Sequence, residues 1–174
     1  MGQEQLNNQR KFQMSAAITI TSDRLSHMLG TARACQEYSK NLFGWDDEKC
    51  EEMFLMGLVH DFAYEFVADQ KHHEHAGGEI LKRAGFAYSD EVFLHGDPDV
   101  ESWTEELFIL NLADMTTSNT GERCSFDQRL DYVVDRYGKN SVQAEKMRLM
   151  IQRIKDTAVD FDVTLYPFVL PANN

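Results

Sequence analysis

Cysteine is scarce in this sequence, and its scarcity narrows the kind of protein that the chain can be. Only three cysteines occur among the 174 residues, Cys35, Cys50 and Cys124, and no two are spaced as Cys-x-x-Cys. An odd number of widely spaced thiols argues against a disulfide-stapled fold and against a thiolate zinc site. The same pattern is typical of reduced thiols, so we expect a cytoplasmic protein.

Positive charge and long apolar runs are also missing. The formal net charge is −12, and no basic stripe is present that could hold a nucleic acid polymer. No apolar run approaches the length of a membrane span, and the first residues lack the basic-then-apolar pattern of a secretory signal. We therefore expect neither a nucleic acid nor a membrane partner. A small phosphorylated substrate would need bound cations to offset its charge.

Prolines are rare, and apolar residues recur at helical spacing along most of the chain. Together with the absence of repeats and low-complexity linkers, this predicts an all-α, single-domain helical bundle. Residues 1–14 are expected to form a polar N-terminal arm, and residues 15–174 the domain, with a C-terminal helix and apolar tail over 141–174. Helices are predicted to begin near residues 22, 46, 72, 89, 99, 125 and 141, with the fifth covering about 99–115.

Two of the predicted helices end an apolar row with an aspartate. One row consists of Cys50, Met53, Phe54, Gly57 and Leu58 and ends at Asp61, directly after His60. The other consists of Trp103, Leu107 and Leu110 and ends at Asp114. Ionisable groups at the edge of a core are costly unless something satisfies them. For a single His-Asp pair the simplest explanation is a capped helix end, but a bound cation is the alternative.

Further histidines on other predicted helices favour the cation. His27 faces a row of small residues, His75 opens the third helix, and His95 ends the fourth. Four histidines and two aspartates without a thiolate favour Fe, Mn, Zn or Ni as the bound metal. His72 and His73 are interpreted as solvated or substrate-side residues.

In this order, His27, His60-Asp61 and Asp114 resemble the signature of the HD-domain superfamily of metal-dependent phosphohydrolases. His75 in His-Ala-Gly-Gly-Glu-Ile-Leu and His95 in Phe-Leu-His-Gly are similar to the two extra histidines of dinuclear members. The stretch from Gly121 to Gly138 resembles the segment that follows in small bacterial members. The resemblance covers about residues 22–138, and the nearest branch is that of the symmetrical diadenosine-tetraphosphate hydrolases.

The resemblance implies a role for each residue. His27, His60, Asp61 and Asp114 would hold one metal ion, and His75 and His95 a second, with Asp61 bridging the two. One or two divalent transition metal ions are expected, Fe or Mn before Zn, Ni, Co or Mg. His60 and Asp61 would serve catalysis, in which an activated hydroxide attacks the phosphorus of a small phosphorylated substrate, a nucleotide being one candidate.

One departure from the family pattern concerns the substrate. Many hydrolytic members carry a basic residue three positions after the aspartate of the His-Asp pair, where this chain has Tyr64. Candidate replacements for a phosphate contact are Lys71, His72, His73, Lys82, Arg123 and Arg129, although a solvated surface charge is the simpler explanation for each.

Three functions remain open from the sequence. The first is a phosphohydrolase. The second is a diiron oxygenase of the same superfamily, which would cleave a C–C or C–P bond with O₂. The third is a non-catalytic sensor that keeps the fold, against which the complete ligand set argues. A homodimer formed through the last helix and the tail is a further expectation.

Overall fold

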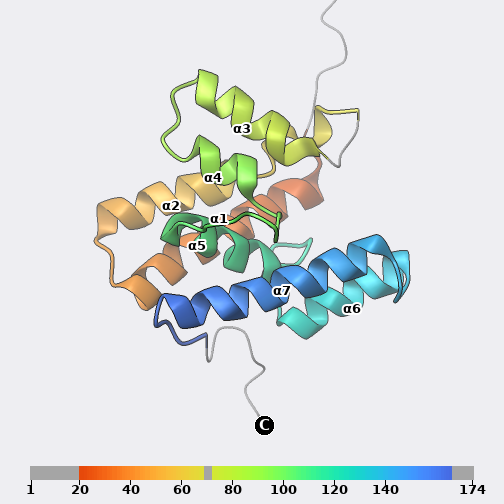
Figure 1. Cartoon of the computed structure of the whole chain (residues 1–174). Helices are drawn as coiled ribbons and strands as arrows, with labels where there is room; N and C mark the ends of the chain where they lie inside the picture. Colours follow the sequence, from red (N-terminus) through yellow and green to blue (C-terminus); the bar gives the residue numbers. More distant parts are fainter. Residues whose placement is uncertain (1–19, 69–71, 166–174) are drawn as a thin grey trace, which may run out of the picture.

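The chain forms a set of packed helices in the computed structural model, which describes residues 20–68 and 72–165. In chain order the elements are α1 (Ser22–Phe43), α2 (Asp47–Val59), the 3₁₀ helix η1 (Phe62–Glu65), α3 (His73–Arg83), α4 (Ser89–Leu94), α5 (Glu105–Met115), α6 (Phe126–Tyr137) and α7 (Val142–Asp160) (Figure 1). No strand occurs in these two ranges, apart from an isolated bridge between Thr117 and Arg123. The prediction of an all-α fold is confirmed.

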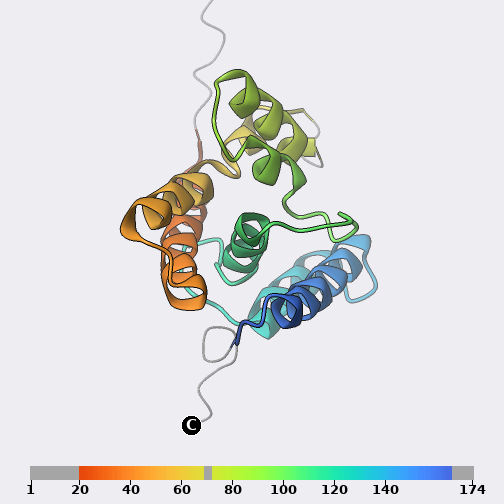
Figure 2. The same cartoon turned by 60° about the vertical axis from the view of Figure 1, so that its left-hand side comes forward.

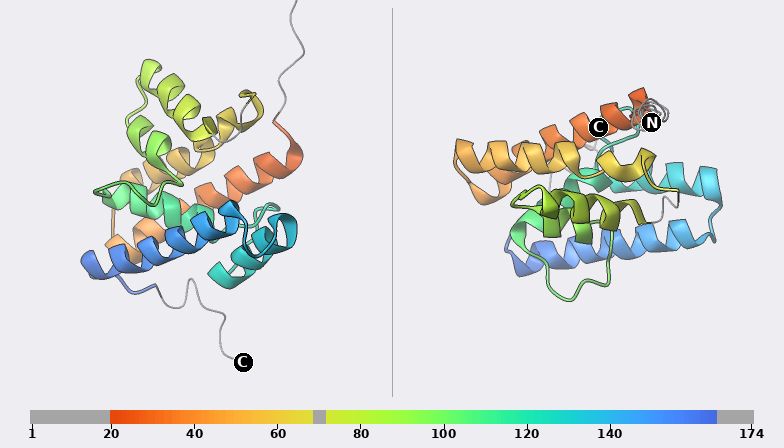
Figure 3. Two further views of the ribbon diagram at one scale, coloured as in Figure 1. Left: turned by 45° about the vertical axis from the view of Figure 1, so that its right-hand side comes forward. Right: turned by 90° about the horizontal axis from the view of Figure 1, so that it is seen from above.

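Helix α5 is the centre of the arrangement. It packs against α1, α2, α4 and α7. Figure 2 shows α1 and α2 on one side of it, α6 and α7 on the other, and the α3–α4 pair above. Figure 1 and the left view of Figure 3 show α3 and α7 at opposite ends of the molecule. The α5 side chains from Leu107 to Ala113 are all almost fully buried, because neighbouring helices surround α5. A helix that is apolar around its whole circumference belongs in such a position.

Most helices begin where a short polar side chain can accept a backbone hydrogen bond. Caps of this kind, each worth about 0.5–2 kcal/mol, are formed by Thr21, Asp46, Thr104, Ser125 and Ser141. The capping box expected at Ser125 is present. Helix α1 ends at Gly44 in the left-handed conformation, with φ of 66°, as a glycine at this position predicts. These signals are local, so the sequence reveals them.

Two predicted boundaries are corrected. The fifth helix begins at Glu105 and not near residue 99, because the Thr104 hydroxyl accepts from the Leu107 amide at 3.1 Å and starts the helix there. Trp103 is still buried, but it precedes the helix. Helix α2 ends at Val59, so Asp61 has φ of −110° and ψ of 10° and opens η1. The Asp61 side chain is therefore placed by this turn and not by the α2 apolar row.

Gly78 sets how closely α3 approaches α4. A Cβ atom at this position would lie 2.4 Å from the Phe93 Cβ and 2.7 Å from its Cα. At the neighbouring Gly77, by contrast, a Cβ would make ordinary contacts at 3.5 Å. This contact leaves α3 little freedom to rotate about its own axis.

The ends of the chain are described only in part. Val163 and Leu165 pack against the core, as expected for the start of the apolar tail. The predicted polar arm over 1–14 and the remainder of the tail lie outside the described residues. Within the described residues, no helix has both the length and the apolar character required to cross a membrane.

Candidate metal centre

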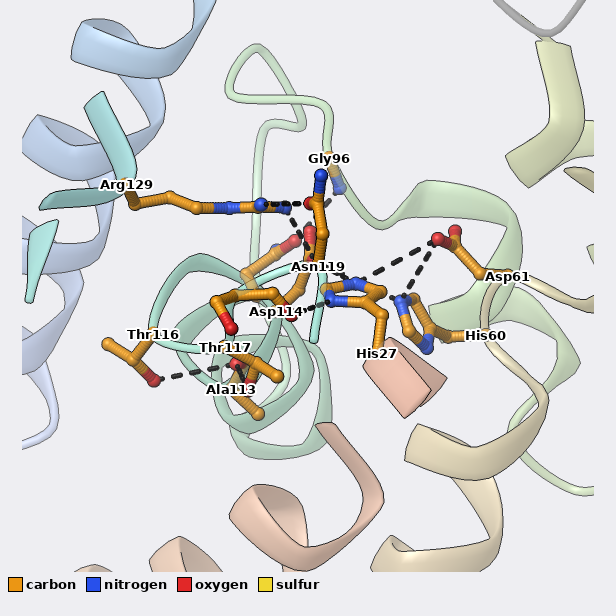
Figure 4. A network of polar contacts seen from close by, with 12 residues as sticks. His27, His60, Asp61, Gly96, Ala113, Asp114, Thr116, Thr117, Asn119 and Arg129 are labelled. Atoms are coloured by element: carbon orange, nitrogen blue, oxygen red, sulfur yellow. Dashed lines mark hydrogen bonds and ion pairs between the residues drawn. The ribbon is translucent and has the colours of Figure 1, made fainter. Parts of the chain in front are cut away.

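Five different elements bring histidine and aspartate side chains to one place beside α5. His27 lies on α1, His60 directly follows α2, Asp61 precedes η1, and Asp114 belongs to the last turn of α5 (Figure 4). His95 directly follows α4. The structure therefore brings together five of the six predicted ligands.

A first group of donor atoms surrounds one oxygen of Asp61. His60 Nε2 lies 3.6 Å and His27 Nε2 3.9 Å from Asp61 Oδ2. Asp114 Oδ1 lies 2.9 Å from His27 Nε2 and 3.9 Å from His60 Nε2. Donors held at about 2.1 Å from one ion are separated by about 3–4 Å. The spacing of this group is therefore suited to a single cation.

A second group surrounds the other oxygen of Asp61. His73 Nε2 lies 2.8 Å and His95 Nε2 3.4 Å from Asp61 Oδ1. In each of the two triads, His27–His60–Asp61 and Asp61–His73–His95, the donor atoms lie within 4.8 Å of one another. Asp61 is the residue that both triads share, and each of its oxygens faces one of them.

Backbone carbonyls orient three of the imidazole rings. The Nδ1 atom of His27 donates to the Ser118 carbonyl at 3.1 Å, and that of His60 to the Gly57 carbonyl at 2.8 Å. His95 donates in the same way to the Val92 carbonyl. A carbonyl can only accept, so the proton resides on Nδ1 in each ring. In the neutral ring, Nε2 then carries the lone pair that a metal ion needs, which is the arrangement that metal-ligating histidines use.

His60 provides the test of whether a metal ion fits. Its Nε2 is fully buried and has no hydrogen-bond partner among the described residues. Burial lowers the pKa of His60 to about 4, so the ring is neutral near pH 7. A lone pair that faces carboxylate oxygens across less than 4 Å is repelled by them unless a cation lies between. The residues present therefore fit a metal ion.

Both carboxylates stay ionised despite their surroundings. Burial alone would raise the pKa of Asp61, but the His60 ring, which becomes charged at acid pH, and hydrogen bonds with His73 and His95 hold this pKa well below its ordinary value. For Asp114, burial is again outweighed, here by the hydrogen bond and charge of His27, and its pKa is also lowered. Two ionised carboxylates among imidazoles form a site for cations.

His75 is the predicted ligand that the structure does not bring to the centre. It is exposed, and its ring stacks on Phe93 with centroids 4.3 Å apart. His73 lies at the centre instead. Residues two positions apart on a helix point in nearly opposite directions. The sequence signal that identifies His73 is its spacing of four residues from the buried Gly77, which places both on the inward face of α3.

Of the residues predicted to contact substrate, the structure places Arg129 in the cleft beside the centre. Its guanidinium donates to Asn119 Oδ1 at 3.0 Å and lies 3.7 Å from Asp114. Arg123 instead pairs with Glu37 at 2.6 Å and lies over the Tyr38 ring, so the structure does not place it in the cleft. His72 is exposed and lies beside the His75 ring. Lys71 lies outside the described residues.

Arg24 is a cleft residue that the sequence analysis missed. Its guanidinium pairs with Asp61 Oδ2 and lies 3.6 Å from the centre of the Tyr64 ring. The signal was its position three residues before His27, which places both side chains on the same face of α1. A guanidinium group therefore lies over the Tyr64 ring.

The cleft next to the centre has a volume of about 470 Å³. One wall carries the His and Asp groups, and the opposite wall is formed by α6, including Tyr132, Arg136 and Tyr137. Clefts of this size commonly accept small molecules.

No protein-family model matches the chain, and neither a curated protein nor a solved structure is significantly similar to it. Its fold and site define it as an all-α protein with a buried His/Asp cluster that could hold a metal ion. Any more specific function must be argued from this cluster and the cleft beside it.

Proposed function

We propose that the chain is a metal-dependent phosphohydrolase of the HD-domain type that acts on a small phosphate ester or anhydride, with nucleotides among the candidates. The observation that carries this proposal is the division of Asp61 between two groups, with Oδ2 facing His27 and His60 and Oδ1 facing His73 and His95. Two adjacent cations are a common solution for displacement at phosphorus.

The residues would divide as follows. His27, His60, Asp61 and Asp114 would hold one divalent ion, and Asp61, His73 and His95 a second. Iron and manganese suit these nitrogen and oxygen donors best. Divalent ions in these positions would lower the pKa of a water molecule and offset negative charge on a phosphoryl group.

The side chains around the ligands support an anionic substrate. The whole chain has a net charge of −12, and the cleft lining includes the acidic residues Asp23, Glu65 and Glu74. Three arginines nevertheless line it as well: Arg24, Arg129 and Arg136. Arg24 reaches it from α1, and the other two reach it from the facing wall. Guanidinium groups bind phosphate oxygens through paired hydrogen bonds. We therefore assign Arg24 and Arg129 to orient the phosphoryl group, with Arg24 replacing the basic residue absent at position 64.

A diiron oxygenase is the second candidate. The observation that favours it is the same donor set of four imidazoles and two carboxylates without a thiolate, which is also suited to iron that reacts with O₂. The two candidates share this ligand set and differ in the reaction, because an oxygenase consumes O₂ and a phosphohydrolase releases phosphate.

Metal analysis combined with a substrate screen tests the proposal. Purified protein is analysed for bound metals, stripped with a chelator, and reloaded with Mn²⁺ or Fe²⁺. It is then assayed for phosphate release from nucleotides, dinucleoside polyphosphates and sugar phosphates. We expect one or two metal ions per chain and phosphate release that depends on them.

The Asp61→Asn variant is the matched negative control. It keeps the shape of the side chain but removes the carboxylate charge that belongs to both ligand groups. It should retain little metal and release no more phosphate than the stripped protein. Consumption of O₂ by the iron-loaded protein, without phosphate release, would favour the oxygenase. Full metal retention by Asp61→Asn would refute the centre itself.

A further inference from the structure

Asn111 is out of place in the apolar environment of α5. Its side chain is 1% exposed, and its neighbours along the helix, Leu110 and Leu112, are both fully buried. A buried amide is unfavourable unless its hydrogen-bonding groups are satisfied. A polar residue at this position therefore requires a structural or functional reason.

The side-chain oxygen of Asn111 makes one specific contact. It accepts a hydrogen bond at 2.8 Å from the backbone N–H of Gly96, the residue that follows the ligand His95. Because an N–H must donate, the oxygen faces Gly96 and the orientation of the amide is determined. The amide nitrogen is buried without a hydrogen-bond partner among the described residues. The amide oxygen of Asn111 is thus hydrogen-bonded and its amide nitrogen is not, so any structural role of the side chain acts through Gly96.

The far end of the connection between α4 and α5 is held by Arg153, which donates to the Val100 and Glu101 carbonyls at 3.2 and 3.1 Å. At the near end, beside His95, the side-chain contact is the one from Asn111. Helix α4 consists of six residues and ends before His95, and the next helix begins at Glu105. Gly96 turns the chain with φ of 73°. The His95 ring is oriented by the Val92 carbonyl of its own short helix. The Gly96–Asn111 hydrogen bond instead ties this turn to the central helix.

The same helix also carries a ligand of the other group. Asn111 and Asp114 are three residues apart, so they lie on one face of α5. Through Asp114 the helix contributes to the first group, and through Asn111 it holds the turn that presents His95 to the second. One rigid element therefore sets the distance between the two groups.

We infer that Asn111 is a positioning residue for the second metal ion, which fixes His95 relative to Asp114 through the backbone of Gly96. This inference rests on the proposed two-metal centre. It concerns the occupancy of the second group and not the substrate or the reaction. Residues that orient ligands in this indirect way commonly change metal affinity about 10–100-fold when they are replaced.

The decisive variant is Asn111→Leu. Leucine has the same branched shape as asparagine, although it is larger, and it removes both the acceptor for Gly96 and the unsatisfied amide nitrogen. We expect the variant to fold with a melting temperature at or below that of the wild type, because the Gly96 N–H loses its partner. Mn²⁺ titration of the metal-free variant should show an unchanged first ion and a second ion bound at least about 10-fold more weakly. Electron paramagnetic resonance should show a loss of coupled Mn–Mn pairs and a gain of isolated Mn²⁺.

Three further variants make the result specific. Asn111→Asp keeps an acceptor for Gly96 and should retain the second ion. Asn111→Ala removes the acceptor without adding bulk and decides the question if Asn111→Leu does not fold. Thr157→Val removes a buried hydroxyl on α7, away from the centre, and should leave both ions unchanged.

The inference would be overturned if folded Asn111→Leu bound both ions as tightly as the wild type, or if both ions were weakened to the same degree. Either outcome would leave the proposed function intact. Wild-type protein that binds a single ion would also overturn the inference. Wild-type protein that binds no metal would instead refute the proposed function, so the two failures are distinguishable.

Discussion

Asp61 Oδ1 lies 2.8 Å from His73 Nε2, which makes His73 and not His75 the contribution of α3 to the centre. Both histidines belong to the first turn of this helix, and the intervening residue separates them by about 200° of rotation. Asp61 is therefore surrounded by imidazoles from four separate elements, and three of them, His60, His73 and His95, lower its pKa.

The assignment of His73 instead of His75 as the α3 ligand can be tested by comparing the metal content of two alanine variants. His73→Ala should remove the second metal ion, because a ligand of the Asp61 Oδ1 group is lost. His75→Ala is the matched control, since the same change on the same helix affects an exposed ring stacked on Phe93. The metal content per folded chain, measured by inductively coupled plasma mass spectrometry, should fall by about one ion in His73→Ala and stay unchanged in His75→Ala. Loss of metal in His75→Ala with retention in His73→Ala would reverse this assignment.

The arginines of the cleft should govern substrate binding. Replacing Arg24 or Arg129 by Met keeps much of the side-chain length but removes the charge. A lost charge-assisted hydrogen bond is worth about 1.5–3 kcal/mol, so KM for a phosphorylated substrate should rise about 10-fold or more in each variant.

Arg123→Met is the control for these two changes. Its guanidinium pairs with Glu37, and both side chains are well exposed, so its loss should change stability by less than about 1 kcal/mol and leave KM unchanged. A similar rise of KM in all three variants would indicate a general charge effect and contradict a specific role for Arg24 and Arg129.

Metal binding should release protons near neutral pH. Burial alone would lower the pKa of His73 and of His95, but Asp61 raises both above their ordinary value. At pH 6.5 both rings are then more than half protonated, and a metal ion must displace those protons. Affinity for the second ion should therefore increase as the pH rises through these two pKa values. His60 does not contribute near neutral pH, because its pKa is about 4.

Calorimetry measures this proton release. Titrations in buffers of different ionisation enthalpy at one pH give the number of protons released per ion bound. Repeating them between pH 5.5 and 8 should show fewer protons at higher pH. An affinity that is independent of pH over this range would contradict the raised pKa values.

Gly121 should be required for the orientation of His27. Its φ is 80°, and a Cβ atom there would lie 2.3 Å from the Ser26 carbonyl oxygen. Its N–H also donates to the Ser118 carbonyl at 3.0 Å, the same oxygen that accepts from His27. Gly121→Ala should therefore lower the melting temperature and weaken the first metal ion, because the loop must move.

Gly138→Ala is the matched control for Gly121→Ala. Gly138 also has positive φ, 95°, but no atom lies within 4 Å of an added Cβ. It should show only the backbone strain of about 1–3 kcal/mol and leave metal binding unchanged. Equal effects of the two substitutions on metal affinity would show that the packing of Gly121 on α1 is not needed.

Much of the fold is determined by local signals that the sequence contains. The start of α6 at its capping box and the end of α1 at Gly44 depend on residues within a few positions of each other. Asp114, in the last turn of the apolar helix α5, also points to a centre, since a charge at the edge of a core requires a partner. Local geometry is enough for these features, so no tertiary information is needed to predict them.

The tertiary structure alone decided which side chains meet. His73 faces Asp61 because Gly78 packs against Phe93 and sets the rotation of α3. Asn111 reaches Gly96 across 15 residues of chain, and Arg24 reaches Asp61 across 37. Such contacts depend on how rigid helices rotate and cross once their faces pack, which is a property of the whole assembly and not of any short stretch of sequence.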